Sequence, residues 1–350
     1  MPPTRQYQVW MFSGGSLVQL RRFLTILPFQ AALVGLLLAP LGLWRAFRTR
    51  RDLGVGLLLL ALGPLLYAIN YSIPDIDSYF VLTFATVVWL AVLGGGALVG
   101  NHPARVPLLF VLPALALALN WSRCDQSGDV AVEEYVRNEA LNLEPGAILV
   151  SADWEHFDSA FWYRQRVTGF RPDVTLVNVN LLRRTWYPAQ LQRWYPETWG
   201  AVADTVPPFL EELERFESGR PFDVRRLQER YVGLIDALVA RHVDRRPVYV
   251  SPAALQIEPA IAREYLKVPA GLVLRVVPKG APAPPPLCRF ELDRILTLPL
   301  AVDDQDTRML LQRVAGAVQG CGRYASFAGR REEAHALDGL FRRLASRLAP

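Results

Sequence analysis

The feature that most constrains this chain is a series of long apolar stretches without charge in its first third. Between Arg22 and Arg45 lie 22 uncharged residues, and another 22 lie between Asp52 and Asp75. Two further uncharged stretches follow, of 24 and 17 residues. Since a helix needs about 20 apolar residues to cross the hydrocarbon core, four such stretches favour membrane spans over buried core helices. We predict spans at 23–44, 53–72, 80–100 and 106–122.

The placement of arginine predicts how these spans are oriented. The loop at 45–52 holds four arginines and the loop at 101–105 is also basic, whereas the loop at 70–80 is acidic. The positive-inside rule places the two basic loops in the cytoplasm. The acidic loop, the lead-in at 1–22 and everything after Trp121 then lie outside. We therefore predict an integral protein of a bacterial inner membrane whose C-terminal domain is extracytoplasmic.

Composition narrows the class of partner. The net charge is +5, and the basic residues are almost all arginine, scattered along the chain or beside the predicted spans. That distribution suits anionic lipid head groups, so we expect the bilayer as a partner and no nucleic acid. The three cysteines form no CxxC pair and predict no zinc site. One disulfide can form outside the membrane, with the pairing left open.

The pattern after Asp129 predicts a different kind of domain. Short apolar strands alternate with helices, which indicates an α/β layer with a largely parallel sheet over 129–280. The four predicted strands are 146–151, 173–179, 246–251 and 271–278. A Pro-rich linker is expected at 281–302 and a helical tail at 303–350, where Gly322, Gly329 and Ala334 have the spacing of a tetratricopeptide helix pair. The alternative for this tail is a simple packing hairpin.

The predicted fold class is therefore an α-helical membrane region of about four spans (23–122), followed by an extracytoplasmic α/β domain with a tetratricopeptide-like tail. Nothing in the chain resembles a P-loop, a nucleophile elbow, a zinc helix or a GxGxxG turn. A transporter is disfavoured because no charge lies in the middle of a span and no inverted repeat is visible.

The acidic loop "NYSIPDIDSYF" is the first candidate site. Asp75 and Asp77 lie two residues apart at the predicted outer boundary, beside Asn70, Tyr71 and Tyr79. Such a pair can coordinate a divalent cation or take a proton from a hydroxyl, so the two acids are the candidate catalytic residues. The alternative is a solvated loop whose acids mark the outer side and whose tyrosines belong to the interfacial aromatic belt.

A second candidate site follows the first predicted strand. Ligands gather at the carboxyl ends of parallel strands, where Asp153 lies. Further polar or aromatic residues of this segment are Trp154, His156 and Asp158. Acids beside Trp162 and Tyr163 suit sugar recognition, because rings stack on sugar faces and carboxylates accept from hydroxyls. The alternatives are that Trp162 belongs to the core face of a helix, and that Arg171 and Asp173 form an ion pair within a turn.

A third group lies in "NLLRRTWYPAQL". Arg183 and Arg184 can bind a phosphate while Trp186 or Tyr187 stacks on a ring. The same four residues could equally rest on a membrane surface beside the spans.

Two segments carry a resemblance to a known family. These are the outer loop "Y-x-I-x-D-x-x-x-Y-F" and "FWYRQRVTGFRPDVTLVNVNLLRRTWYPAQL" after the strand that ends at Asp153. Over most of 10–275 the chain resembles the C-terminal half of a bacterial multi-pass family catalogued as a domain of unknown function. That family is similar to the animal transmembrane protein O-mannosyltransferase that modifies plexin-type receptors. The matching motif positions are Asp75, Tyr79, Asp153, Trp162, Tyr163, Arg171, Asp173, Trp186 and Tyr187.

The resemblance implies a C-type glycosyltransferase that uses a polyprenyl-phosphate-linked sugar as donor at the outer membrane face. The acceptor would be an extracytoplasmic protein or glycan. The family's early acidic and His-Pro-Pro-Gly-type motifs are absent, so we expect a missing N-terminal half as a partner. The alternative function is a non-enzymatic, membrane-anchored module that binds a glycan or a protein.

Overall fold

The chain divides into two compact units, the N-terminal unit at 1–128 and the C-terminal unit at 129–350. The computed structural model describes residues 11–12, 14–73, 76–100, 102–282, 288–297 and 305–348. Asp75, half of the lead-in at 1–22 and parts of the predicted linker lie outside these residues.

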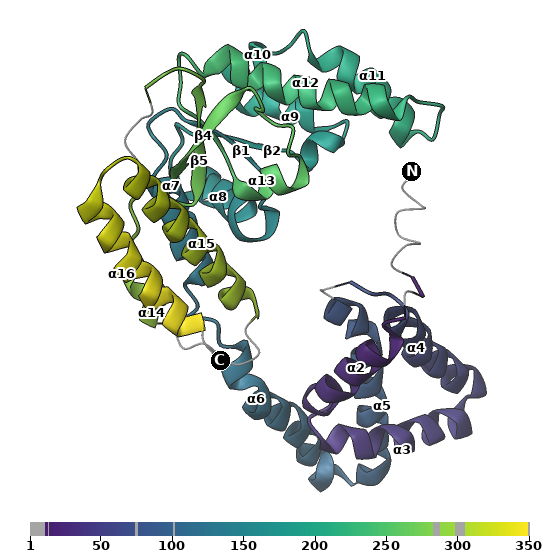
Figure 1. Cartoon of the computed structure of the whole chain (residues 1–350). Helices are drawn as coiled ribbons and strands as arrows, with labels where there is room; N and C mark the ends of the chain where they lie inside the picture. Colours follow the sequence, from purple (N-terminus) through teal and green to yellow (C-terminus); the bar gives the residue numbers. More distant parts are fainter. Residues whose placement is uncertain are drawn as a thin grey trace. The chain divides into compact units, whose positions relative to one another are not determined.

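The N-terminal unit is helical, as Figure 1 shows. Its elements are α2 (Ser16–Gln30), α3 (Val34–Thr49), α4 (Arg51–Ile69), η1 (Ile76–Phe80), α5 (Val81–Val99), η2 (Pro103–Phe110) and α6 (Val111–Cys124). Three helical stretches are long and apolar enough to cross a membrane: Arg51–Ile69, Ile76–Val99 and Ala104–Ser122. These correspond to the second, third and fourth predicted spans.

The first predicted span, at 23–44, is not one continuous helix. Helices α2 and α3 pass the same test only together, and their axes bend by 95° at the break between them. Ala32 and Leu33 have φ angles of 51° and 58°, a conformation that costs energy for residues other than glycine and ends the regular helix. Pro28 lies one turn earlier and removes a backbone donor. Among its described residues, the unit therefore has three candidate spans, or four if the bent pair counts as one.

Helices α3 and α5 approach each other closely at two glycines. A Cβ atom added to Gly94 would lie 2.1 Å from the carbonyl oxygen of Leu38, and one added to Gly42 would lie 1.8 Å from the carbonyl oxygen of Leu90. Small residues at a crossing allow backbones to pack in this way, which is a common basis of helix association in membranes. The crossing therefore tolerates no side chain at either glycine.

We predict that Gly94→Leu destabilises the N-terminal unit by about 3 kcal/mol, since the added side chain forces two backbones apart. Gly96→Leu is the matched control, because a Cβ atom at Gly96 of the same helix meets nothing within 4 Å. The measurement is thermal unfolding of the full chain in detergent. Equal unfolding temperatures for the two variants would contradict the proposed crossing.

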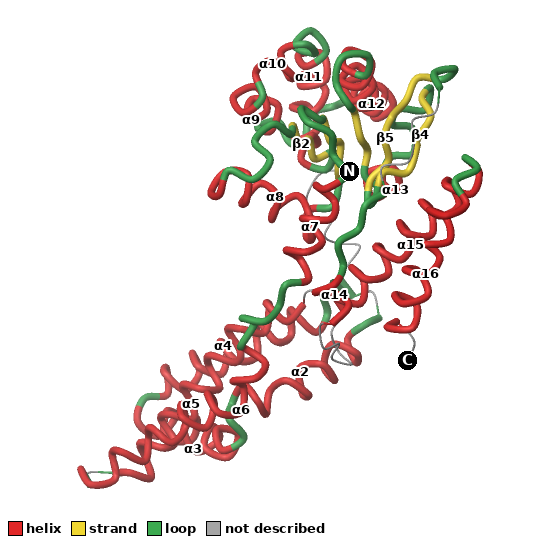
Figure 2. Tube along the Cα trace, turned by 90° about the vertical axis from the view of Figure 1, so that its left-hand side faces the viewer, coloured by secondary structure: helices red, strands yellow, loops and turns green. Residues whose placement is uncertain are grey.

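The C-terminal unit is a mixed α/β fold around a five-stranded sheet (Figure 2). The strands are β1 (Ile148–Ser151), β2 (Thr175–Asn178), β3 (Val248–Val250), β4 (Tyr265–Ala270) and β5 (Val273–Pro278), in the order β2-β1-β3-β5-β4. Strands β1, β2 and β3 are parallel and fully buried, as expected for short apolar runs covered on both faces. The four predicted strands are confirmed, but the sheet is mixed and not largely parallel: β5 is antiparallel to β3, and β4 is an additional edge strand antiparallel to β5.

Helices precede, connect and follow these strands. The segments before β3 are α7 (Ala131–Leu141), the π-helical turn η3 (Trp154–Asp158), α8 (Ser159–Tyr163), the π-helical turn η4 (Arg164–Thr168), η5 (Leu181–Arg183), α9 (Tyr187–Trp194), α10 (Pro196–Gly200), α11 (Val206–Glu217) and α12 (Val224–His242). Those after β3 are α13 (Pro252–Ile257), α14 (Asp293–Thr297), α15 (Gln305–Phe327) and α16 (Arg331–Leu348).

The C-terminal helices share one core with the sheet. Leu311 and Val314 of α15 and Leu344 of α16 are buried in the same hydrophobic cluster as Leu149 and Val177 of the strands. Helices α15 and α16 form one hairpin, and the two helices lie side by side in Figures 1 and 2. The tail predicted at 303–350 therefore packs as part of the C-terminal unit, and its tetratricopeptide-like character stays a prediction.

A disulfide between Cys288 and Cys321 ties the segment before α14 to α15. It closes a loop of 33 residues, whereas Cys124 is a free, exposed thiol. A crosslink of this loop length restricts the unfolded chain and is worth about 3–4 kcal/mol in the chain-entropy model.

We predict that Cys288→Ser combined with Cys321→Ser lowers the free energy of unfolding by about 3 kcal/mol, because the unfolded chain regains the freedom that the crosslink removes. Denaturant unfolding of the full chain measures the difference. Cys124→Ser serves as the control and leaves the stability unchanged. A double variant as stable as the control would show that the crosslink does not form.

Candidate functional site

The candidate residues that the sequence places together in the C-terminal unit lie at two opposite edges of the sheet, formed by the carboxyl ends and the amino ends of the strands. Asp153 follows the carboxyl end of β1. Arg171 and Asp173 precede β2 and lie at the amino ends of the strands, beside Gly146. The two groups therefore cannot act on one ligand, and each has to be described by its own contacts.

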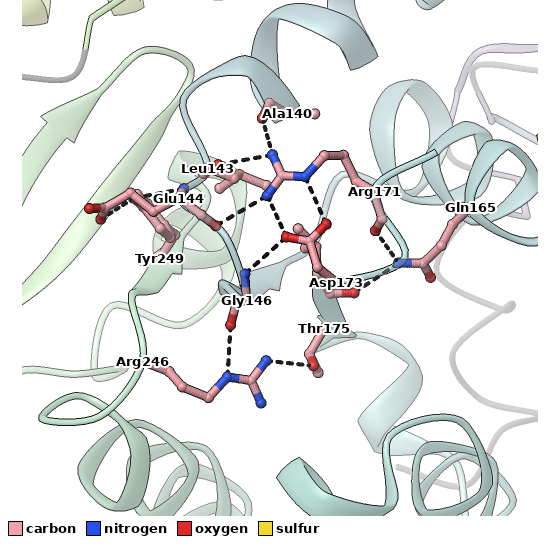
Figure 3. Close-up of polar contacts among 11 residues, drawn as sticks. Ala140, Leu143, Glu144, Gly146, Gln165, Arg171, Asp173, Thr175, Arg246 and Tyr249 are labelled. Atoms are coloured by element: carbon pink, nitrogen blue, oxygen red, sulfur yellow. Dashed lines mark hydrogen bonds and ion pairs between the residues drawn. The ribbon is translucent and has the colours of Figure 1, made fainter. Parts of the chain in front are cut away.

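Arg171 is the centre of a structural clamp, drawn in Figure 3. Its guanidinium donates to the carbonyl oxygens of Ala140, Leu143 and Glu144, at 2.8, 2.9 and 3.1 Å, and so satisfies backbone acceptors at the end of α7. The same group forms two 2.9 Å hydrogen bonds to the carboxylate of Asp173. These contacts use all three nitrogens of the planar guanidinium. They also hold Arg171 in a backbone conformation, with a φ of 47°, that is unfavourable for residues other than glycine.

Asp173 completes this clamp. Its Oδ2 atom accepts a 2.9 Å hydrogen bond from the backbone N–H of Gly146, just before β1. The hydrogen bond from Arg171 is the main cause that lowers the pKa of Asp173 to about 2. The pair therefore joins the end of α7, the start of β1 and the start of β2, and its role is to shape the fold at this edge.

Asp153 lies in a different environment at the carboxyl edge. The side chain is 5% exposed, and its Oδ2 atom is 2.5 Å from a guanidinium nitrogen of Arg313 on α15. Tyr135 of α7 donates to the same oxygen at 3.1 Å, and Nδ1 of His156 lies 3.4 Å from Oδ1. Burial acts to raise the pKa of Asp153, but the neighbouring side chains of His156 and Arg313 outweigh it and lower the pKa overall.

Two further acids are buried behind Asp153. Asp158 is fully buried and accepts a short hydrogen bond from the side chain of Asn178, at the end of β2. Burial raises the pKa of Asp158 to about 7. Glu139 of α7 is 1% exposed and its Oε1 atom has no hydrogen-bond partner. Burial, followed by the nearby charges of Asp153 and Asp158, raises the pKa of Glu139 well above its ordinary value.

Of these groups, Tyr135, Glu139, Asp153 and Arg313 line a cavity of about 340 Å³ at the carboxyl edge of the sheet. Strand β1 pairs with β2 on one side and with β3 on the other. After β1 the chain continues toward β2, whereas after β3 it continues toward β4 and β5, so the cavity lies where the two connections diverge. This is the position at which α/β sheets bind ligands. The lining residues are Tyr135, Glu139, Asp153, Ser251, Pro252, Ala253, Gln256, Pro269, Gly271, Leu272, Val273, Leu274, Arg313, Gly316, Ala317 and Gly320.

The other aromatic candidates lie outside this cavity lining. Tyr187 is fully buried and its hydroxyl accepts from the backbone N–H of Asn178, so it belongs to the core. Trp162 is also buried, in contact with the rings of Tyr187 and Trp154. Tyr163 and Trp186 are exposed, at 64% and 52%. Two of the four therefore stabilise the unit, and two are accessible on its surface.

The outer loop of the N-terminal unit presents one described acid, Asp77. Its carboxylate forms a two-bond ion pair with Arg22 of α2, with Nε–Oδ1 and Nη2–Oδ2 distances of 2.7 and 2.8 Å. Arg22 lies in contact with both carboxylate oxygens, so a divalent cation would have to compete with this arginine for Asp77. Asp75 lies outside the described residues. Within the part of the chain that the structure describes, no three His, Cys, Asp or Glu side chains are grouped to hold a metal ion.

The neighbours of Asp77 hold the loop in place. Asn70 accepts from the hydroxyl of Ser16 at 2.9 Å and donates to the carbonyl oxygen of Leu66 at 2.8 Å. Tyr71 is buried and its ring contacts that of Tyr79, which is 40% exposed. Among the three, Tyr79 is therefore the residue with the most surface open to a ligand.

The comparison with protein families gives one finding. Residues 134–200 match the family model TMEM260-associated domain 2. The match runs from within α7 to the end of α10, and it supports in this segment the predicted relationship to the animal O-mannosyltransferase. It contains Glu139, Asp153 and Asp158 but not Arg313. No curated protein and no solved structure matched the chain.

Sequence reasoning missed several residues of the cavity. Ser251 follows β3 as Asp153 follows β1, so the rule of strand carboxyl ends could have found it. Glu139 and Tyr135 have an (i, i+4) spacing on α7, which places them on one face of that helix. Arg313 lies 160 residues from Asp153 in the sequence, and no local pattern indicates that the two side chains meet.

We predict that Asp158→Asn changes how stability depends on pH. The pKa of Asp158 is about 7 in the folded protein, whereas its ordinary value is 3.8. As pH rises, the unfolded chain therefore loses this proton at a lower pH than the folded chain. The wild type therefore loses a few kcal/mol of stability between about pH 4 and 7, and the variant lacks this loss.

Denaturant unfolding of the full chain at pH 5 and pH 8 measures the effect. Asp204→Asn is the control, since Asp204 is an exposed acid paired with Arg241 and its pKa of about 2 lies below this range. The same difference between pH 5 and pH 8 in the wild type and in Asp158→Asn would contradict the prediction.

Proposed function

We propose that this chain is part of a membrane glycosyltransferase that moves a sugar from a polyprenyl-phosphate donor to an extracytoplasmic protein or glycan. The observation that carries the proposal is the match to TMEM260-associated domain 2 in the same chain as three or four helices able to span a membrane. A lipid-linked donor and a membrane-embedded enzyme belong together, because the donor's lipid tail keeps its head group at the bilayer surface.

The ion pair of Arg22 and Asp77 suits the chemistry of such a donor. Arginine binds phosphate oxygens with the same fork that it offers to a carboxylate. A donor phosphate that engages Arg22 competes with Asp77 and leaves that carboxylate free to take the acceptor's proton. The acceptor oxygen then bonds to the anomeric carbon, the bond from that carbon to the phosphate oxygen breaks, and its electron pair leaves with the polyprenyl phosphate.

Two features support an extracytoplasmic C-terminal unit that binds the acceptor. The arginines at 45–52 favour a cytoplasmic position for that loop, so the segment after three further spans lies outside. The disulfide of Cys288 and Cys321 is typical of proteins in oxidising compartments. The cavity beside Asp153 would then orient the acceptor.

Glycan analysis of extracytoplasmic proteins, with and without this gene in its own host, tests the proposal. We predict that Asp75→Asn combined with Asp77→Asn abolishes sugar transfer without changing membrane insertion, because no carboxylate remains to take the proton. The control is Asp52→Asn, an exposed acid paired with Arg50 in the arginine-rich loop. Normal transfer by the double variant would exclude the proposed role of the two acids, and an unchanged glycan profile without the gene would exclude the function.

The ion pair also favours a second candidate function. Because Arg22 already occupies both oxygens of Asp77, the described part of the outer loop resembles a structural contact. In that case the N-terminal unit is an anchor and the C-terminal unit binds a glycan or protein without transfer. This function would be supported if the purified chain binds a glycan or protein and deletion of its gene leaves the glycan profile unchanged.

A further inference from the structure

The cavity at the carboxyl edge of the sheet is built by parts of the C-terminal unit that are distant in sequence. Helix α7, the loop after β1, the start of α13, the turn between β4 and β5, and helix α15 all contribute to its walls. Its volume of about 340 Å³ lies at the lower end of the range for small-molecule sites. The cavity therefore has room for one small group, comparable to a single ring.

Glu139 shows that this cavity has an unmet hydrogen-bonding need. The side chain lines the cavity and is 1% exposed, yet its Oε1 atom has no partner. Buried polar atoms in folded proteins nearly always have a hydrogen-bond partner, and leaving one without costs free energy. A ligand in the cavity would supply the missing partner.

The charges around the cavity favour a neutral ligand. The carboxylate of Asp153 is balanced by Arg313 at 2.5 Å. Burial raises the pKa of Glu139, which acts against a negative charge on that group. An anion would have to compete with Asp153 for Arg313 and would lie close to further acids. A cation would find the carboxylate of Asp153 already paired with Arg313.

The remaining groups suit a ligand that has several hydroxyls and an apolar face. Tyr135 and Gln256 can each donate and accept hydrogen bonds, Glu139 adds a carboxyl group, and all three residues line the cavity. Leu272, Val273 and Pro252 form an apolar part of its wall. This combination of a few convergent polar groups with apolar walls is the usual make-up of a small-molecule site.

We propose that this cavity binds one sugar ring, or a neutral polyol group of similar size, on the acceptor side of the reaction. The inference rests on the proposed function and adds the site and the chemical class of its ligand. Helix α15 forms one wall, so the helical hairpin at the end of the chain is part of the binding site.

The test uses the full chain in lipid nanodiscs prepared without sugar-based detergents, since alkyl glycosides would occupy the cavity. Saturation-transfer NMR with methyl hexopyranosides of several configurations is the binding measurement. Methyl phosphate and methylamine, whose methyl protons report binding in the same measurement, serve as anionic and cationic probes. We expect saturable binding of at least one hexoside and none of the two ions.

A matched pair of glycine variants locates the binding. Gly320 of α15 lines the cavity, and a Cβ atom at this position meets nothing within 4 Å, so Gly320→Leu fills the cavity without a backbone clash. Gly339→Leu on α16 makes the same change at an equally open position outside the cavity lining. We expect Gly320→Leu to weaken binding at least about tenfold and Gly339→Leu to leave it unchanged.

A second pair of variants tests the role of Glu139. Glutamine has nearly the same shape as glutamate and keeps a side-chain oxygen that accepts hydrogen bonds, so Glu139→Gln retains binding within about threefold, whereas Glu139→Leu loses it. Thermal unfolding of each variant confirms that the protein is folded.

Three results would overturn the inference: equal hexoside binding by the wild type and Gly320→Leu, binding of methyl phosphate or methylamine in place of the hexosides, or no hexoside binding at all. Hexoside binding that Gly320→Leu abolishes, in a chain without transfer activity, would support the cavity and reject the proposed enzyme. Sugar transfer by a chain that binds no hexoside would support the proposed enzyme and reject the cavity as a sugar-binding site.

Discussion

The ion pair of Asp153 and Arg313 is the contact on which the C-terminal unit depends most. It joins the end of the first strand to a helix 160 residues later in the chain. Without Arg313, Asp153 would be a buried negative charge beside Glu139 and Asp158, which is strongly unfavourable. The pair therefore allows three acids to gather at one edge of the sheet, and it also brings α15 over that edge. A cavity exists there because the sheet and the terminal hairpin meet through this contact.

Residues of similar chemistry have different roles at the two edges of the sheet. Arg171 and Asp173 bind each other and several backbone groups, so every polar atom of the clamp is used within the fold. At the opposite edge Asp153 is also paired with an arginine, but Glu139 beside it has an oxygen without a partner. The match to TMEM260-associated domain 2 includes Arg171 and Asp173 at one edge as well as Glu139 and Asp153 at the other. Only the contacts separate a residue that holds the fold from one that can meet a ligand.

The N-terminal unit relies on close packing of small residues. At the crossing of α3 and α5, Gly42 and Gly94 bring two backbones into contact, as suits helices that have no hydrophobic effect to drive them together in lipid. At the loop after α4, Arg22 and Asp77 join α2 to η1 through an ion pair. The proposed chemistry uses this second contact, because an arginine that holds a carboxylate can exchange it for a phosphate.

The amino-acid sequence by itself determined the class of the two regions. Uncharged stretches of 22 and 24 residues are long enough to cross a bilayer whatever their neighbours are, and the buried parallel strands appear as short apolar runs such as Ile148–Ser151. Asp153 could be placed at a strand end by the same local reasoning. The bend at Ala32 and Leu33 could not, because it depends on backbone conformations that alanine and leucine rarely adopt.

The tertiary structure alone decided which polar groups meet. Tyr187 and Trp162 look like binding residues in the sequence, but packing buries them in the core. The partnership of Asp153 with Arg313 and the choice of Cys288 and Cys321 for the disulfide join segments that no periodicity relates. Local patterns report the surroundings of a residue only over a turn or a strand, whereas a binding site is formed by contacts between distant segments.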